Sequence, residues 1–533
     1  MRGLASRFKS VNSAPMRARD PEREAAGKTI SFPPPIAGLK LLAGPTQIPD
    51  GGAFVLDNWT CLSSGVFPRG GYRPRNTGIP GTVAAIMPYE SGALRKLFAV
   101  GGASTHGIYA VSLDGDAAGS ALVSSLVSTI WSSLQFTTGG GSFLIATGAG
   151  NAPRIFDGAT WASVSFTGGT LPTLTTLGHA WAHGARLFFA EHGSMNAWYL
   201  DVDSIGGALT KFSLGGVFPL GGSLLCGATW TTDAGNSGLQ SSCVFMTTMG
   251  EVAIYDGHDP TSWTLRGVYH LSPPLGQNCF LKTGGDVAVM TRDGLVALSQ
   301  AESLDRAALA NESVSKDIRP LWRAAVAATD GTKWQITRFD ALGVGIISVP
   351  EYEGGQAAQF VINLETGAWS RWIGYQATCF AVTGDELVFG VSDGTIMRAG
   401  DTGSDNGAPY SAPYIGPYRD KGGRIIAAKL ARAVTHAVQN FAPKIGVLFD
   451  YSDKPIAGGS SGISSGEALW NSALWNSSSV WGGGFEPRLF WQSCSGIGTA
   501  FAPCVVYTVG QVSPPQINLL RTDLVIEVGA VVA

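Results

Sequence analysis

The sequence is poor in charged residues and in long apolar runs. Of its 533 residues, 14% are Asp, Glu, Lys or Arg, well below the roughly 25% of an ordinary globular domain. Basic and acidic residues nearly balance, and the formal net charge is −3. A near-neutral chain is not expected to offer a broad nucleic-acid-binding surface, because such surfaces neutralise many phosphates. No run of about 18 apolar residues occurs, so no membrane-spanning helix is predicted.

Cysteine is scarce and scattered. The seven cysteines have wide spacings and no CxxC pair, which argues against both a disulfide framework and a zinc site. We expect buried thiols in a protein that is assembled in a reducing compartment, with a Cys494–Cys504 hairpin bridge as the alternative. No metal ion or other cofactor is predicted.

The motifs of catalysis are incomplete. The pattern G-x-S-x-G occurs around Ser460 and Ser464, but it lies in a Gly/Ser loop, and no histidine follows His436 to complete a triad. His179 and His183 are four residues apart in a segment that is typical of a strand. On a strand such positions lie about 13 Å apart, which is too far to share one metal ion.

The acidic turn GDTGSDNG is a further incomplete motif. Its residues Asp401, Asp405 and Asn406 weakly resemble a calcium-binding loop, but the closing Glu is missing at the required spacing. We interpret them as solvated turn residues. A P-loop and a dinucleotide-binding G-x-G-x-x-G after a strand are also missing.

Short strand-like segments are the main feature that is present. Segments such as KLFAVGG, SFLIATG, RLFFAEHG and ELVFGVSDG end in Gly or Asp-Gly, as strands that run into hairpin turns do. The 72 glycines and 28 prolines fit a chain with many tight turns. The sequence therefore predicts an all-β protein.

A weak repeat underlies these strands. A strand leads through a turn to a tryptophan at Trp161, Trp263 and Trp369, and successive units start roughly 40 to 65 residues apart. This is near the length of a four-stranded propeller blade. We predict a β-propeller of about six blades over residues 81–404, with a stack of β-sandwiches as the competing fold.

One helix is expected near residues 313–328. Its apolar residues share one helical face, and its proline comes early enough to be tolerated. The face consists of Ile318, Leu321, Trp322 and Val326. We interpret the helix as an insertion within a blade.

Both ends of the chain are assigned outside the propeller. Residues 1–35 contain seven Lys/Arg within the first 28 positions and no apolar signal-peptide core. We predict an extended arm that orders on a neighbouring subunit or partner, with a frayed tail as the alternative. Residues 36–80 and 405–533 are assigned to a sandwich-like platform domain, as its N-terminal and C-terminal parts.

Three tryptophans lie in a ribbon of Ser, Asn and Gly at residues 468–484, ALWNSALWNSSSVWGGG. Their spacings of five and six match neither one helical face nor one strand face, so each is expected to mark a short strand-turn unit. Either all three pack on the C-terminal β domain, or at least one contacts a neighbouring subunit. The candidate subunit-interface residues are Trp470, Trp475, Trp481, Arg17 and Arg19.

Four segments follow one another in an order that carries a family resemblance. They are PDGGAFVLDNWTCLSSGVFPRGGYRPRNTG, AWYLDVDSIGGALTKFSLGGVFPLGGSLLCGATWTTDAG, the segment from Phe360 to Tyr410 that begins FVINLETGAWSRWIGYQ, and the tryptophan ribbon. Together they resemble the tail nozzle, or tail tube, proteins of short-tailed bacteriophages. The resemblance spans most of residues 36–533.

The resemblance implies a homohexameric nozzle ring in the virion tail, assembled in the cytoplasm of the bacterial host. The propellers would build the distal tube, and the platform would dock on the adaptor below the portal. Contacts with tail fibres or tailspikes are implied, as is passage of double-stranded DNA through the ring without specific binding. No enzymatic activity is expected.

The alternative is a β-propeller glycoside hydrolase or carbohydrate-binding protein. The segment TTDAGNSG, residues Thr231 to Gly238, approaches the Asp-box turn of sialidases but lacks its closing aromatic residue. A glycosidase also needs two carboxylates on either side of the substrate, and the sequence does not pair them.

Overall fold

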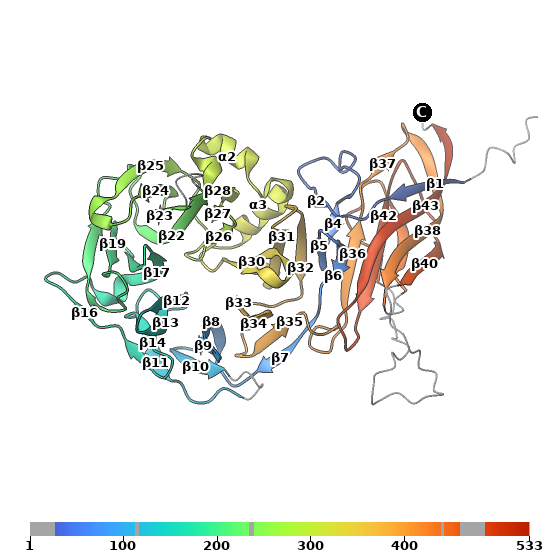
Figure 1. The fold of residues 1–533 in the computed structure, drawn as a ribbon. Coiled ribbons are helices and arrows are strands. Elements are labelled where there is room, and N and C mark those ends of the chain that lie inside the picture. The colour runs from blue at the N-terminus through green and yellow to red at the C-terminus, as the bar shows by residue number, and fades with distance from the viewer. Residues whose placement is uncertain (1–26, 112–116, 234–238, 439–441, 459–485, 532–533) are drawn as a thin grey trace, which may run out of the picture.

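The protein consists of a ring of small sheets beside a two-sheet sandwich (Figure 1). A computed structural model describes residues 27–111, 117–233, 239–438, 442–458 and 486–531. Nearly all regular structure in these residues is β-strand. The predicted all-β class, with a propeller and a sandwich-like platform, is confirmed.

The ring is a β-propeller, and the described residues form seven blades. Neighbouring blades contact one another through their first strands, or through the adjacent strand in one case, and the last blade returns to the first. Blades 1 and 2 consist of β8 (Thr82–Ser91), β9 (Leu94–Gly102), β10 (His106–Val111), β11 (Val123–Leu126), β12 (Ser132–Thr138), β13 (Gly141–Thr147), β14 (Arg154–Phe156) and β15 (Trp161–Ser163). Blades 3 and 4 consist of β17 (Leu177–His183), β18 (Arg186–Glu191), β19 (Asn196–Tyr199), β21 (Thr210–Ser213), β22 (Leu224–Asp233), β23 (Leu239–Thr247), β24 (Glu251–Asp256) and β25 (Thr264–His270).

The remaining three blades are irregular. Blade 5 has the three strands β26 (Phe280–Thr283), β27 (Asp286–Thr291) and β28 (Gly294–Ala297). Blade 6 has β29 (Gln335–Phe339), β30 (Val344–Glu353), β31 (Gln356–Asn363) and β32 (Trp369–Ile373), extended by β2 (Gly38–Leu39) and β3 (Gly52–Ala53). Blade 7 has β33 (Cys379–Thr383), β34 (Glu386–Gly390), β35 (Ile396–Ala399) and β7 (Tyr72–Asn76). A short parallel pair, β16 (Phe166–Thr167) with β20 (Gly207–Ala208), lies outside the blades.

Blade 7 explains why the ring has one blade more than the expected number of about six. Its outer strand β7 comes from residues 72–76 and pairs antiparallel with β35, over 300 positions later in the chain. No single stretch of sequence therefore contains the whole blade, and a search for a repeating unit along the chain does not detect it. The pairing also moves residues 72–76 from the expected platform segment, residues 36–80, into the propeller.

Helices replace the fourth strand of blade 5. They are α1 (Leu298–Ala301), α2 (Arg306–Glu312) and α3 (Arg319–Ala328), and a 3-10 turn at Lys316–Ile318 precedes α3. Ile318 and Trp322 are fully buried in the core, and Leu321 and Val326 pack against it. The predicted helix and its apolar face are thus present, although regular helix starts at Arg319. None of the helices in the described part of the chain is long and apolar enough to cross a membrane.

The sandwich is built from both ends of the chain. One sheet, here called the outer sheet, has the order β1 (Lys28–Phe32), β43 (Ile517–Val531), β38 (Arg424–Ala437) and β40 (Glu486–Ser493), and β41 (Ile497–Gly498) also pairs with β38. The inner sheet contains β37 (Arg419–Asp420), β42 (Ala500–Val509), β36 (Tyr410–Ile415), β4 (Val55–Leu56) and β39 (Lys444–Phe449). Residues 28–32, expected within the extended arm, are therefore an edge strand of the outer sheet.

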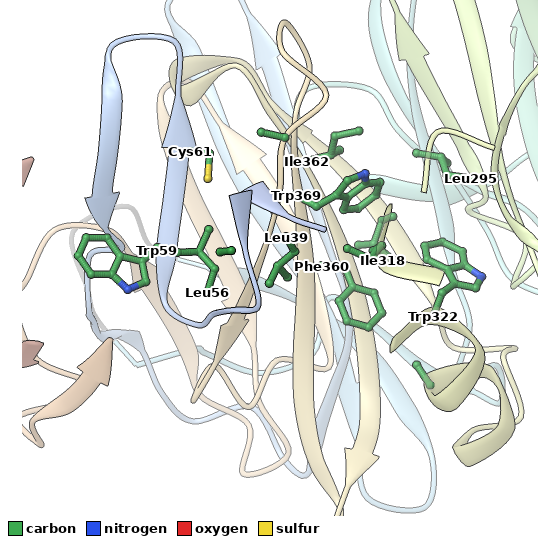
Figure 2. Close-up of a cluster of buried hydrophobic side chains, with 14 of the residues drawn as sticks. Leu39, Leu56, Trp59, Cys61, Leu295, Ile318, Trp322, Phe360, Ile362 and Trp369 are labelled. Atoms are coloured by element: carbon green, nitrogen blue, oxygen red, sulfur yellow. The ribbon is translucent and has the colours of Figure 1, made fainter. Parts of the chain in front are cut away.

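One hydrophobic core runs through the contact between propeller and sandwich. The hairpin β5 (Trp59–Leu62) and β6 (Gly65–Pro68) lies at this contact, since β5 packs on β32 and β6 packs on β43. Figure 2 shows Trp59 and Leu56 on one side of this core and Trp369 and Trp322 on the other. The apolar packing is continuous from the helices of blade 5 to the outer sheet, so the two bodies share their core.

Candidate functional site: channel, junction and outer sheet

The channel of the propeller holds a cavity of about 910 Å³. First strands of the blades line it, among them β8, β12, β17 and β22. At one end, the Asn278 side-chain amide donates to the Trp131 carbonyl oxygen at 3.0 Å. Asn278 leads into blade 5 and Trp131 into blade 2, and these blades are not neighbours in the ring. A side chain therefore crosses the channel of the single propeller.

His179 and His183 lie on β17, and each has its own partner on β22. The Nε2–H of His179 donates to the Gly227 carbonyl oxygen at 3.2 Å, and Nδ1 of His183 bonds the Thr229 hydroxyl at 3.1 Å. Burial lowers the pKa of both imidazoles to about 4, so both rings are neutral at neutral pH. Across the described residues, no group of three or more His, Cys, Asp and Glu side chains is placed to hold a metal ion.

The acidic turn has a structural role that differs from the expected one. Asp401 pairs with Arg73 at 2.7 Å and with Arg398 at 3.3 Å, and Asp405 pairs with Arg69 at 2.7 Å. Only 19% and 11% of the two aspartate side chains are exposed. The interpretation as solvated turn residues is therefore wrong for Asp401 and Asp405, because arginines from the N-terminal part of the chain reach them.

All seven cysteines are free. Six are buried and Cys494 is partly buried, so the alternative Cys494–Cys504 bridge is not formed. Burial raises the pKa of the Cys61 and Cys379 thiols to about 12, which keeps them protonated and unreactive. The prediction of buried thiols is confirmed.

Several predicted residues lie outside the described part of the chain. They are the interface candidates Trp470, Trp475, Trp481, Arg17 and Arg19, the elbow-like Ser460 and Ser464, and residues 234–238 of the Asp-box-like segment. Residues 1–26 precede β1, and residues 459–485 precede β40, so both segments join the outer sheet.

Arg69 lies at the junction of propeller and sandwich. All five N–H groups of its guanidinium have acceptors: Asn58 Oδ1, the Gly70 and Ile373 carbonyl oxygens, and both oxygens of Asp405. Its guanidinium carbon lies 4.2 Å from the ring centre of Tyr375 in the propeller and 4.2 Å from that of Tyr410 in the sandwich. Burial opposes its charge, but these tyrosines and Asp405 outweigh burial and raise the pKa of Arg69.

The glycines after Arg69 allow this arrangement. A Cβ on Gly71 would lie 2.1 Å from the Ser404 carbonyl oxygen, and one on Gly70 would lie 2.5 Å from Cα of Gly400. Neither approach is sterically tolerable, so the segment RGGY needs glycine at both positions for strands β7 and β35 to reach one another. The Tyr375 hydroxyl donates to the Gly70 carbonyl oxygen at 2.6 Å.

A second set of contacts joins the bodies through Trp59. Its indole N–H donates to the Pro413 carbonyl oxygen in the sandwich at 3.1 Å, and its own carbonyl oxygen accepts from the Trp372 indole at 3.0 Å. Asp57 pairs with Arg371 of blade 6 at 2.7 Å. Sequence reasoning quoted these residues in the segment that carries the family resemblance but did not assign them a role, because burial of Arg69 and Asp57 follows only from tertiary contacts.

Comparison with known proteins gives structural similarities but no match by sequence. No known family matches its sequence, and no curated protein matches it. Among solved structures, the chain is similar to the computationally designed Ika8 protein (10% identity, TM-score 0.33, 61% of this chain and 99% of that one). It is also similar to BBS1N in complex with ARL6DN (10%, 0.37, 62% and 96%) and to Saccharomyces cerevisiae Sqt1 (12%, 0.34, 62% and 98%). These similarities are too low to bear on function, and the propeller is assigned from its own sheets.

Proposed function

We propose that the chain is a structural subunit of the tail of a short-tailed bacteriophage. Six copies would form a nozzle ring below the portal and adaptor, through which DNA leaves the virion and to which tail fibres or tailspikes attach. The observation that carries the proposal is the order of the four resembling segments, together with a propeller whose core continues into a sandwich built from both chain ends.

The junction supports a mechanical role. A ring subunit has to transmit the forces that act on its platform to its distal end without bending between the two bodies. Here the two bodies share one hydrophobic core, the buried Arg69–Asp405 pair and the Trp59 hydrogen bonds. Interfaces between independently moving domains are usually smaller and more polar, so this junction favours a rigid subunit.

The hydrogen bond across the propeller channel supports a DNA path that runs between the subunits of the ring and not through a single propeller. Because the Asn278 side chain reaches Trp131 across the propeller channel, the conduit in this proposal runs along the axis of the ring. A near-neutral subunit suits a conduit, since each phosphate that the wall neutralises would add salt-sensitive retention of DNA. The residues weighed as metal ligands, His179, His183, Asp401 and Asp405, all have structural partners. These partners favour a structural role for them.

The proposal is tested by the oligomeric state. Native mass spectrometry and negative-stain microscopy of the full chain are expected to give a six-fold ring, with or without the adaptor protein. A monodisperse monomer that stays monomeric beside the adaptor would contradict the proposal.

The channel cavity is the observation in favour of the alternative, a carbohydrate-binding propeller. Gln277 Nε2 and His179 Nδ1 are buried without hydrogen-bond partners, and both residues line the cavity. Glu351 is the one carboxylate in the lining formed by the described residues, so the pair of carboxylates for glycoside hydrolysis is missing there. Saturation of a monomer by a soluble glycan in calorimetry would favour the alternative.

A further inference from the structure

The outer sheet leaves one face to solvent. Along β38 the side chains alternate: Ala431 and Ala433 face the sandwich core, and Leu430, Arg432 and Val434 face outward. Figure 1 places this sheet at the end of the molecule farther from the propeller. The outward face carries large apolar side chains on neighbouring strands, with Leu489 59% exposed, Trp491 46% exposed and Leu430 40% exposed.

A row of four side chains fixes the centre of this face. The strand registers place Ser31, Asp523, Arg432 and Trp491 next to one another across β1, β43, β38 and β40. The Ser31 hydroxyl donates to Asp523 Oδ1 at 2.7 Å, and Arg432 Nε donates to Asp523 Oδ2 at 2.9 Å. The Arg432 guanidinium then lies 4.5 Å from the centre of the Trp491 ring.

Asp523 holds this row together. Burial disfavours its charged form, but Ser31, Arg432 and Arg521 outweigh burial, and the pKa of its carboxyl lies below the usual value. The Asp523 carboxylate thus holds the Arg432 side chain in position, and the Arg432 guanidinium holds the Trp491 ring in position. Side chains that are ordered before contact lose little conformational entropy on binding.

The composition of the face is typical of an interface core. Trp and Arg dominate the binding energy of interfaces, and they act where apolar neighbours exclude water. Leu430 and Leu489 lie next to the Arg432–Trp491 pair and provide such neighbours. Isolated exposed apolar residues need no explanation, but a contiguous group around a fixed tryptophan marks a binding surface.

The charges of the face indicate its partner. Its cations are Arg424, Lys429, Arg432 and Arg521. Arg432 and Arg521 share the buried Asp523, and Lys429 pairs with Glu527 at 3.0 Å. The cations outnumber the two carboxylates, so contact between two copies through this same face is disfavoured, because the excess positive charges would oppose one another. Since the whole chain has a net charge of −3, its acid excess lies elsewhere on the chain.

We propose that the outer face of the sheet β1–β43–β38–β40 docks onto a different, acidic surface of a second copy of this chain. Contacts between two different surfaces are heterologous and close into rings when the rotation permits. The inference rests on the proposed ring in that it assigns one side of the contact between neighbouring subunits. It names Trp491, Leu489 and Arg432 as the centre of that side.

The test compares two variants of the full chain by mass photometry across a concentration series. In the first, Leu489→Ser is combined with Trp491→Ala. The control is Leu265→Ser on β25, which removes a leucine that is 46% exposed on the propeller. Thermal melting and far-UV circular dichroism show whether each variant is folded. A series in NaCl up to about 1 M tests the ionic contribution, because salt screens exposed charges.

We expect wild type and Leu265→Ser to assemble alike, and the double variant to remain folded while its assembly midpoint rises more than tenfold. Assembly of the wild type is expected to weaken with salt. If the double variant forms the wild-type ring at the wild-type midpoint, the assignment of this face is wrong and the proposed ring stands. If the wild type is monomeric throughout, also with the adaptor, both proposals fail. If the double variant unfolds, the single variant Leu489→Ser replaces it in the comparison. A raised assembly midpoint then supports the assignment of this face, and the wild-type midpoint contradicts it.

Discussion

Replacing Arg69 by methionine tests how strongly the propeller and the sandwich are joined. The variant keeps an unbranched side chain but removes five hydrogen-bond donors and two ring contacts. It also leaves the Asp405 carboxylate, only 11% exposed, without its cation. Breaking a buried ion pair from one side costs about 3–5 kcal/mol. We therefore expect Arg69→Met to lower the free energy of unfolding by that amount.

The assay is a double-mutant cycle in urea, followed by tryptophan fluorescence and far-UV circular dichroism. The cycle uses Arg69→Met, Asp405→Asn and the two combined, and we expect the double variant to be less destabilised than the sum by more than about 1 kcal/mol. Arg73→Met is the control, because Arg73 pairs with Asp401 while 57% exposed, and exposed pairs contribute about 0–1 kcal/mol. A loss below about 1 kcal/mol for Arg69→Met, or strict additivity in the cycle, would refute the reasoning.

Three further predictions concern other parts of the chain. Burial lowers the pKa of His179 from 6.5 to about 4, so the unfolded chain takes up the proton before the folded chain does as pH falls. The free energy of unfolding should therefore drop by about 1.6 kcal/mol between pH 6.5 and 5 through this group, and His179→Gln should remove that part of the pH dependence in urea titrations. Cys494 should react with a thiol reagent first, and the six buried cysteines only on unfolding; fast labelling of several thiols in the native protein would contradict the fold. Trp475→Ala should weaken ring assembly more than it lowers monomer stability, and equal loss of both, by native mass spectrometry and thermal melting, would place Trp475 within its own domain.

Local patterns predicted the strands, and long-range pairing decided the rest. Alternation and Gly-terminated segments sufficed for β9, β13, β18 and β34, because a hairpin forms within one stretch of chain. The helix with Trp322 was predictable for the same reason. The pairing of β7 with β35 joins segments more than 300 positions apart, and the pairing of β1 with β43 joins the two ends of the sequence. Periodicity along the chain does not predict either pairing.

The junction and the outer face escaped sequence reasoning for a related reason. Arg69 is an arginine in a Gly-rich segment, and only its tertiary neighbours Tyr375, Asp405 and Tyr410 reveal that it is buried. Trp491 lies in the segment RLFWQS, which is typical of a strand with alternating faces. Which face is outward depends on the register with β38, and that register is set by the whole sheet.

The pairing of β1 with β43 has a consequence for synthesis of the chain on the ribosome. Ser31 and Asp523, which bond one another in the outer sheet, are 492 positions apart. At about 5–20 residues per second, the earlier strand emerges about 25 to 100 s before its partner exists. Blade 7 imposes a similar delay on β7. The ring cannot close before β35 has been synthesised, and the sandwich cannot close before β43 has been synthesised. Exposed strand edges therefore persist for much of translation, and a chaperone that covers such edges would raise the yield of folded chain.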